Sequence, residues 1–258
     1  MRILVLMKAV PVVGLERLDG EWRTVRDELE ANGADEYLLE KALRLTEPDR
    51  GEVSLLTMGP PAASEALRKA LAMGAARAYH VSDARLAGSD LNATILVLEA
   101  AVRLIGFDLL FCGADTSDGQ GGVVGAAIAI RLGLPYLSHA AEVAPSPDGG
   151  SVRVHRLSAA GYDVLEAPMP AVVMGTQLLG EPRYPSLRGI MAARSKETVT
   201  WSLDDLGIDP SRVGHAAAGT SVRAAEAPVG RTAALIVRAG PEEAVRQVVD
   251  FLAARRLI

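Results

Sequence analysis

The sequence of 258 residues predicts an α/β fold with a doubly wound, mostly parallel sheet and an extended C-terminal arm. Short apolar runs without polar alternation, such as Arg2–Met7, are typical of strands that are covered on both faces. These runs alternate with longer amphipathic segments, which is the order of elements in a parallel sheet flanked by helices. Beyond about residue 200 the pattern thins, and residues 209–230, which are rich in Ala, Gly, Pro and Ser, predict the arm.

The first half of the chain supplies the alternating elements. Asn32 or Asp35 can cap the first helix, and Gly74 and Gly106 are expected to end the second and third. Strands are expected at residues 2–7, 52–58, 76–81 and 108–113, and helices at residues 32–45, 62–73, 90–105 and 126–132.

The segment between the first strand and the first helix is predicted to lack regular structure. Pro11 and Gly14 end any strand or helix there. Residues 15–31 are polar and predict a surface excursion, with a hairpin around Asp19 and Gly20.

The pattern changes after Leu132. Antiparallel strands and one further buried strand are expected at residues 138–143, 152–157, 162–166 and 171–176. Residues 241–257 close the chain as an amphipathic helix, with an apolar side formed by Ala244, Val245, Val248, Val249 and Leu252. A helix at the end of an arm needs another surface to cover its apolar side, on its own domain or on a partner chain.

Composition excludes several classes of protein. Hydrophobic residues are 49% and charged residues 23%, which is enough for a large core. The net charge of −5 argues against a general nucleic-acid binder, and the single cysteine excludes a disulfide framework. No run approaches the roughly 18 apolar residues of a membrane span, and the short apolar start does not suit a signal peptide. We therefore expect a cytoplasmic protein without membrane insertion.

The stretch Gly113–Gly125 is the strongest candidate for a binding site. It contains five glycines and lies between an expected strand and an expected helix, an arrangement that can present backbone N–H groups to an anion. Neither Rossmann nor Walker spacing is met, so the loop alone is equally compatible with a plain connection. Ligands of such sheets bind at the carboxyl ends of the strands, where the loops at residues 8–14 and 58–61 are also expected.

Other chemistry-bearing residues give weaker signals. The four histidines are scattered without metal-ligand spacing, and Cys112 lies in an apolar run typical of an inert buried thiol. Asp115 and Asp118 could form a carboxylate pair for Mg²⁺ or for acid–base catalysis, but no third ligand accompanies them. We therefore predict neither a metal site nor a catalytic residue.

Seven stretches, taken together and in order, resemble a known family. They are residues 32–45, 58–61, 69–75, 113–125, 181–193, 204–209 and 230–233. The most specific of them begins with Glu181-Pro-Arg-Tyr184. Nearly from end to end, the chain resembles the β subunit of electron transfer flavoprotein (ETF), the ETF β/FixA family. The resemblance implies a Rossmann-like sheet of the adenine nucleotide α-hydrolase type.

The resemblance implies an electron carrier rather than an enzyme. An ETF β subunit pairs with an α subunit, binds AMP structurally, and helps to form an FAD site that the α subunit mostly supplies. The pair takes electrons from acyl-CoA dehydrogenases of fatty acid oxidation, or from similar flavoenzymes, and passes them to ETF-quinone oxidoreductase. No catalytic acid or base is needed, because the flavin carries the redox chemistry.

The implied nucleotide site gathers residues from several strand ends and from the start of the first helix. Its members are Leu6, Asn32, Gly33, Ala34, Asp35, Met58, Gly113, Thr116, Asp118, Gly119, Gln120, Gly121, Gly122, Val123 and Val124. Asn32 can offer an amide donor and an acceptor to a base or ribose, although without the family a plain N-cap is favoured. Asp118 would repel a phosphate, so we assign it to turn formation or to a ribose hydroxyl. The phosphate is expected on the N–H groups of residues 119–124.

The implied docking loop comprises residues 180–193. Leu187 occupies the place of an apolar anchor that inserts into the dehydrogenase, and Tyr184, Ile190 and Met191 could support it. The alternative is an ordinary solvated loop whose apolar residues pack inward. The expected domains are a nucleotide-binding domain, residues 1–200, which includes this loop, and residues 201–258, an arm and helix that pack on the partner subunit.

Three alternative functions stay open at this point. An electron-bifurcating ETF β subunit would hold a second FAD in the place of AMP. A regulatory nucleotide-binding module of the universal-stress kind would have a similar sheet and would act alone. An adenylating or ATP-hydrolysing enzyme on the same sheet would turn over ATP.

Overall fold

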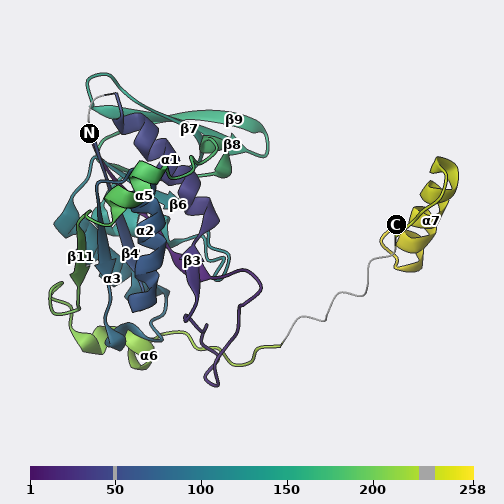
Figure 1. The fold of residues 1–258 in the computed structure, drawn as a ribbon, viewed down its shortest axis with the longest axis horizontal. Helices are drawn as coiled ribbons and strands as arrows, with labels where there is room; N and C mark the ends of the chain where they lie inside the picture. The colour runs from purple at the N-terminus through teal and green to yellow at the C-terminus, as the bar shows by residue number, and fades with distance from the viewer. Residues whose placement is uncertain (49–50, 227–235) are drawn as a thin grey trace. The chain divides into compact units, whose positions relative to one another are not determined.

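The computed structural model describes residues 1–48, 51–226 and 236–258, which form two compact units. The first unit, Met1–Val222, holds the sheet and most of the helices, and the second, Arg223–Ile258, holds helix α7 (Pro241–Ala254) (Figure 1). One of the seven stretches of the family resemblance, residues 230–233, lies outside the described residues. The division of the chain at residue 200 stays a prediction, and the first compact unit extends 22 residues beyond it.

A nine-stranded sheet is the framework of the first unit. From one edge to the other its strands are β11 (Thr198–Trp201), β5 (Arg77–Val81), β4 (Glu52–Met58), β1 (Arg2–Leu6), β6 (Leu109–Gly113), β10 (Ala171–Gly175), β7 (Tyr136–Pro145), β8 (Ser151–Ser158) and β9 (Gly161–Pro168). The strands from β11 to β7 are parallel, and β8 and β9 continue the sheet antiparallel. This confirms the doubly wound, mostly parallel sheet.

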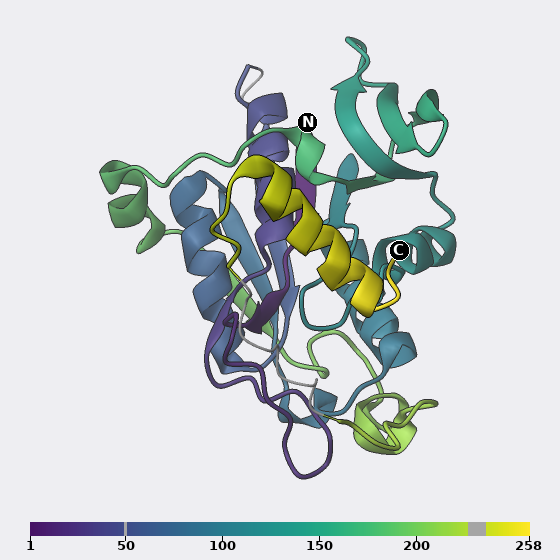
Figure 2. The same cartoon turned by 90° about the vertical axis from the view of Figure 1, so that its right-hand side faces the viewer.

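Helices cover both faces of the parallel strands, as two perpendicular views show (Figures 1 and 2). One face carries α1 (Gly33–Thr46), α2 (Ser64–Met73) and α5 (Leu187–Ala193), and the other carries α3 (Leu91–Ile105) and α4 (Val124–Leu132). Successive side chains of a strand point to opposite faces. In β1, Ile3 and Val5 therefore pack in the core beside α1 and α2, whereas Leu4 packs beside α3 and α4.

The helix ends follow local signals in the sequence. The side chain of Asp90 accepts a hydrogen bond from the Ala93 N–H at 3.0 Å and so caps α3. Gly106, at a φ of 69°, ends the same helix in a backbone conformation that favours glycine. The remaining short helical turns are η1 (Pro61–Ala63), η2 (Ala84–Leu86), η3 (Gln177–Leu179), η4 (Pro210–Arg212) and α6 (Gly214–Ala217).

A small antiparallel ribbon stands where regular structure was not expected. Strand β2 (Ala9–Pro11) pairs with β3 (Leu29–Ala31). Pro11 does not prevent this pairing, because the ribbon has only two strands and a proline is tolerated on an edge. Between the two strands, Leu18 and Thr24 form an isolated antiparallel bridge, in agreement with the expected hairpin.

The expectation of an extended arm over residues 209–230 is wrong for its first part. Strand β11 joins β5, and the segment with η4 and α6 stays packed on the first unit. The N–H of His215 donates to the Ala87 carbonyl at 3.1 Å, and the N–H of Gly214 donates to the Ser89 hydroxyl at 2.9 Å. Sequence patterns did not predict these contacts, because the buried apolar residues of this segment are single and widely spaced. They are Leu203, Ile208 and Val213.

The second unit presents a helix without a buried side chain among its described residues. Helix α7 is amphipathic, as expected, and ends at Ala254 rather than at residue 257. Within this unit Val245, Val248 and Val249 are exposed on its apolar side. In the described parts of the chain, no helix combines the length and apolar character needed to cross a membrane.

Candidate functional site

The glycine-rich loop lies between β6 and α4, at the carboxyl edge of the parallel strands. The N–H of Gln120 donates to the Thr116 carbonyl at 2.9 Å, which closes a turn inside the loop. Among the described residues, no hydrogen bond is donated by the backbone N–H groups of Gly119, Gly121, Gly122, Val123 and Val124. The space beside the Gly121 Cα is open, because a Cβ atom there would meet nothing within 4 Å. The loop thus offers free donors next to a helix N-terminus.

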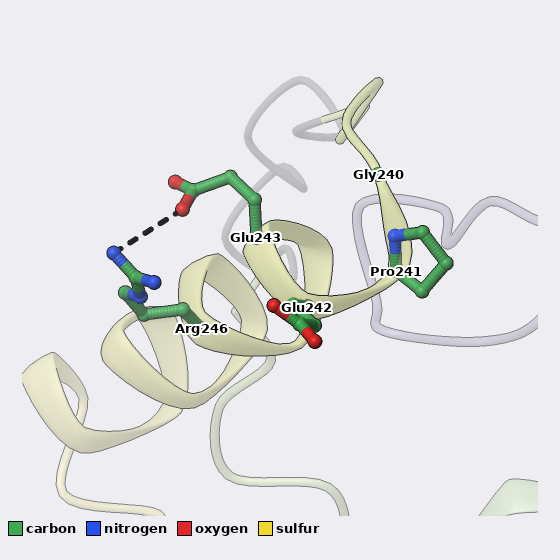
Figure 3. A pocket seen from close by; sticks show the side chains of 5 residues that line it. All are labelled: Gly240, Pro241, Glu242, Glu243 and Arg246. Carbon is green, nitrogen blue, oxygen red and sulfur yellow. Dashed lines mark ion pairs between the residues drawn. The ribbon is translucent and has the colours of Figure 1, made fainter.

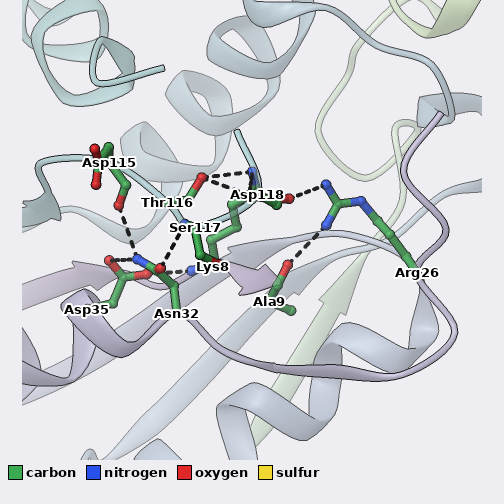
Figure 4. Close-up of polar contacts among 9 residues, drawn as sticks. All are labelled: Lys8, Ala9, Arg26, Asn32, Asp35, Asp115, Thr116, Ser117 and Asp118. Carbon is green, nitrogen blue, oxygen red and sulfur yellow. Dashed lines mark hydrogen bonds and ion pairs between the residues drawn. The ribbon is translucent and has the colours of Figure 1, made fainter. Parts of the chain in front are cut away.

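Asn32 connects the start of α1 to this loop (Figure 4). Its side-chain N–H donates to the Asp115 carbonyl at 3.1 Å, and its side-chain oxygen accepts from the Ser117 N–H at 3.3 Å. Asn32 occupies the N-cap position, but its side chain makes no capping hydrogen bond to the helix. Asn32, one of the two residues that could cap α1, therefore does not cap it through its side chain. The buried amide fixes the loop instead.

Asp35 is a buried carboxyl in the first turn of α1. It accepts hydrogen bonds from the backbone N–H of Lys8 at 2.8 Å and from the Asn32 amide at 3.1 Å. Burial raises the pKa of Asp35 to about 7, against the lowering effect of these two hydrogen bonds. The carboxyl thus joins Lys8, just beyond the end of β1, to the start of α1.

Asp118 lies inside the loop between two cations (Figure 4). Its carboxylate accepts from Lys8 Nζ and from an Arg26 Nη, each at 2.7 Å, and from the Thr116 hydroxyl at 2.8 Å. The side chain is only 4% exposed. Burial raises the pKa of Asp118, but the hydrogen bond and charge of Lys8, with the hydrogen bonds from Thr116 and Arg26, outweigh it and lower the pKa to about 2.

Lys8 and Arg26 are functional candidates that sequence analysis missed. Lys8 lies two residues beyond the end of β1, and this place near a strand end was the available signal. Arg26 was assigned to a polar surface excursion, yet its guanidinium reaches the Ala9 carbonyl at 3.1 Å as well as Asp118. That contact bridges 92 positions of sequence, and no local pattern could reveal it.

The other predicted nucleotide-site residues lie around the same edge. Leu6 and Met58 end β1 and β4 and pack against the core on the face of α3 and α4. Gly113 ends β6 beside Asp35, and Gly33 and Ala34 open α1. The structure therefore brings the predicted residues together at one edge of the sheet.

The predicted docking residues lie on a short helix and just before it. The segment expected to be a loop contains α5, whose N-cap is Ser186 through a 3.0 Å hydrogen bond to the Gly189 N–H. Tyr184, just before α5, is 94% exposed. On the helix, the exposed fractions are 76% for Leu187, 47% for Ile190 and 66% for Met191. The alternative in which these side chains pack inward is therefore excluded within the first unit.

Other features of the described residues do not form a comparable site. No cluster of three or more His, Cys, Asp or Glu side chains with metal-ligand geometry occurs among them. Cys112 is buried, and burial raises the pKa of its thiol to about 12, as expected for an inert thiol. A hollow at the start of α7 is bordered by one helical turn, with Glu243 and Arg246 paired at 3.3 Å (Figure 3).

Comparison with known proteins decides the family. The model of the electron transfer flavoprotein domain matches residues 22–206. The electron transfer flavoprotein subunit beta of Mycobacterium bovis is 38% identical over 266 aligned positions, which cover 99% of each chain. The chain belongs to the electron transfer flavoprotein β subunit family. This confirms the resemblance found in the sequence.

Two relatives that carry other names are nearly as similar. Subunit CarD of the caffeyl-CoA reductase-Etf complex of Acetobacterium woodii is 36% identical over 86% of each chain. Protein FixA of Azorhizobium caulinodans is 37% identical over 90% of this chain and 86% of its own length. As an ETF β member, the chain is expected to associate with FAD and to have an α-subunit partner. Family membership favours an electron carrier over the regulatory-module and ATP-consuming alternatives.

Proposed function

We propose that this ETF β chain forms a heterodimer with an ETF α subunit, binds AMP structurally and completes an FAD site shared with the α subunit. The heterodimer carries electrons from acyl-CoA dehydrogenases or related flavoenzymes to ETF-quinone oxidoreductase. Bound FAD would accept and release the electrons. The residues of this chain bind, orient and dock, and none acts as a catalytic acid or base.

The observation that carries the nucleotide proposal is the row of free N–H groups in the glycine-rich loop. Residues 121–124 offer four such donors at the start of α4, where the helix dipole also favours an anion. Open space lies beside Gly121, so a phosphate can approach the backbone. Asn32 fixes the loop from behind through Asp115 and Ser117. These features fit the phosphate of AMP without a metal ion.

The charges around the loop also suit an anion. An unpaired Asp118 would repel a phosphate, but Lys8 and Arg26 both neutralise its carboxylate. The three groups together carry a net charge of +1. A single nucleotide phosphate would therefore find a mildly positive surrounding besides the backbone donors. Because of this pairing, the Asp118 carboxylate would not repel a phosphate bound near it.

The exposed side of α5 supports the docking part of the proposal. Tyr184, Leu187 and Met191 are mostly exposed, and several large exposed apolar side chains on one short segment favour a protein–protein contact site. Leu187 opens the helix and is the anchor that we expect to enter a pocket of the electron donor. The donors considered are acyl-CoA dehydrogenases and related flavoenzymes.

A second candidate is the electron-bifurcating form of ETF, with a second FAD in the place of AMP. The 36% identity to CarD, a subunit of a reductase–Etf complex, favours keeping this candidate. The AMP half of FAD would use the same loop, held in place by the same contacts between Asn32 and the loop. The two candidates therefore differ in the ligand released from the complex, and the loop residues involved are the same.

The electron-carrier proposal is tested by coupled reduction. The chain is co-expressed with its α subunit, and the purified complex is mixed with an acyl-CoA dehydrogenase and its acyl-CoA substrate. We expect the visible flavin absorption of the complex to bleach, and to return when a quinone oxidoreductase and quinone are added. A complex that forms with FAD but is reduced by no flavoprotein dehydrogenase would contradict the proposal.

A further inference from the structure

Arg183 ties the segment before α5 to the buried Glu40 of α1. Its Nε donates to Glu40 Oε2 at 2.7 Å and one Nη donates to Glu40 Oε1 at 3.1 Å, so the fork of the guanidinium meets both carboxylate oxygens. The backbone N–H of Arg183 adds a bond to Glu40 Oε2 at 3.1 Å. The other Nη reaches Glu47 at 2.5 Å. Arg183 thus makes three contacts with Glu40 inside α1 and one with Glu47, the C-cap residue of the same helix.

Glu40 is built to receive this arginine. Its side chain is 1% exposed, and Arg44, one turn further along α1, donates to it at 2.6 Å. Burial raises the pKa of Glu40, but the hydrogen bonds from Arg183 and Arg44 outweigh burial and lower the pKa to about 2. The carboxylate is therefore charged at neutral pH. A buried carboxylate that loses one of its cations is costly, and Lys cannot reproduce the bidentate fork.

The other side of α5 is fixed to α2. Gly189 lies directly against the Ala72 carbonyl, and a Cβ atom at position 189 would overlap with that oxygen. Just beyond α5, Lys196 Nζ donates to the carbonyls of Leu71 at 2.8 Å and of Ala75 at 2.6 Å. These carbonyls lie at and just beyond the C-terminus of α2, where a cation is favoured by the helix dipole. The segment is thus held at both ends by buried or half-buried polar contacts.

The held segment has little intrinsic stability of its own. Helix α5 has seven residues, and so short a helix does not persist in water without external contacts. Within it only Ala193 is buried, while Leu187 and Met191 face outward. The outward side chains add no packing energy in the unbound chain. The helical shape of the patch therefore depends on Arg183, Gly189 and Lys196.

We propose that Arg183, seated on Glu40, is a positioning residue that keeps α5 in its docking conformation, with Lys196 as a second fixed point. This inference rests on the proposed docking function of α5. An electron donor would then meet a preformed apolar face, and binding would not have to order a mobile loop. Arg183 itself does not have to touch the donor.

The test compares Arg183→Lys with Arg68→Lys in the complex of this chain with its α subunit. Both changes replace an ion-paired arginine by lysine, but Arg68 pairs with Glu65 on an exposed side of α2, with exposed fractions of 66% and 55%. Hydrogen–deuterium exchange followed by mass spectrometry reports the order of residues 187–193 directly. Steady-state reduction by an acyl-CoA dehydrogenase gives KM for the dehydrogenase and kcat. Glu40→Gln, which removes the carboxylate charge, serves as the second variant.

We expect exchange in α5 to become about 10-fold faster in Arg183→Lys and Glu40→Gln, with Arg68→Lys unchanged. KM for the dehydrogenase should rise about 3- to 10-fold with little change in kcat, because the donor must now order the segment. Leu187→Ala should raise KM without changing the exchange. Unchanged exchange in both positioning variants would overturn the inference. Faster exchange with unchanged KM would uphold the positioning role and refute docking through α5.

Discussion

The carboxylate of Asp118 accepts a hydrogen bond from Lys8 Nζ at 2.7 Å, and the two residues are 110 positions apart in the sequence. Arg26 binds the other carboxylate oxygen at the same distance. The glycine-rich loop is thus joined to Lys8, just beyond the end of β1, and to the chain before β3. Asp118 fixes the loop, and both of its carboxylate oxygens are paired with cations.

Asp118→Asn should destabilise the first unit. The variant loses two ion pairs of a buried carboxylate, but Lys8 and Arg26 are partly exposed, so we expect a loss of about 2 kcal/mol in the free energy of unfolding at pH 7. The folded-state pKa lies below the ordinary pKa of an Asp carboxyl, so this stability is present above pH 4 and is lost as pH falls toward 2.

Urea unfolding at pH 7 and pH 3 tests this prediction, with Asp27→Asn as the control. Asp27 pairs with Arg17 at 2.9 Å, but both side chains are well exposed, so the control should lose less than about 0.5 kcal/mol. The loss in Asp118→Asn should be smaller at pH 3 than at pH 7. Equal losses in Asp118→Asn and Asp27→Asn would refute the role of the pairing.

The fold was predictable because local patterns decide it. Apolar runs such as Leu109–Gly113 are long, unbroken and flanked by turn residues, so strand and helix positions follow from a window of neighbours. The two ends of α3 are set by equally local chemistry, since Asp90 caps its start and Gly106 ends it. Strand β11 escaped prediction because its partly exposed residues 198–201 carry only a weak apolar signal, and its pairing with β5 is a tertiary choice.

The candidate site was predictable in position but less so in its bonds. The glycines and Asn32 mark the edge of the sheet from the sequence, and the family resemblance adds the ligand class. Lys8, Arg26 and Arg183 reach partners about 90 to 140 positions away, at distances that only the folded chain sets. A capping asparagine also cannot be distinguished by pattern from one, such as Asn32, whose side-chain amide binds another loop.

Asp35→Asn should change how stability depends on pH. The folded-state pKa of Asp35 is about 7, above the ordinary pKa of an Asp carboxyl, so the folded chain binds a proton more strongly than the unfolded chain. This residue's contribution therefore falls as pH rises from about 4 to about 7, by at most about 4 kcal/mol. Asparagine does not titrate, so the variant lacks this fall.

Denaturant unfolding of wild type and Asp35→Asn at several pH values between 4.5 and 7.5 measures the difference. A constant offset is expected, because asparagine cannot accept both hydrogen bonds that Asp35 receives from Lys8 and Asn32. In addition to this offset, the free energy of unfolding of the variant should rise relative to that of wild type as the pH increases. Parallel curves for the two proteins would show that Asp35 does not titrate in this range.

Leu187→Ala should slow electron transfer from a dehydrogenase while the nucleotide content stays the same. Truncation of a buried anchor in a contact site removes on the order of 1–2 kcal/mol, so the second-order rate should fall about 10-fold. Leu104→Ala is the matched control, since Leu104 is 61% exposed on α3. Stopped-flow reduction of the complex gives both rates, and an equal rate in the two variants would remove the docking assignment.

Gly125→Ala should be destabilising through one contact. A Cβ atom at this position would overlap with Cys112 Sγ, where α4 packs on β6, and overpacking of this kind costs about 1–3 kcal/mol. Adding Cys112→Ala should recover part of the loss, because the remaining Cβ of residue 112 would lie 3.4 Å away. Thermal unfolding of both single variants and the double variant measures the coupling. Gly20→Ala, with nothing within 4 Å, controls for the added methyl, and purely additive losses would contradict the contact.

The nucleotide content of the purified protein tests the central claim most directly. The chain is purified alone and as a complex with its α subunit, both are denatured, and the released molecules are identified by chromatography and visible absorption. We predict AMP from the chain, with one FAD appearing only in the complex. Two FAD per complex without AMP would assign the bifurcating form. No adenine nucleotide in either sample, together with no binding when AMP is added back, would contradict the account of the loop.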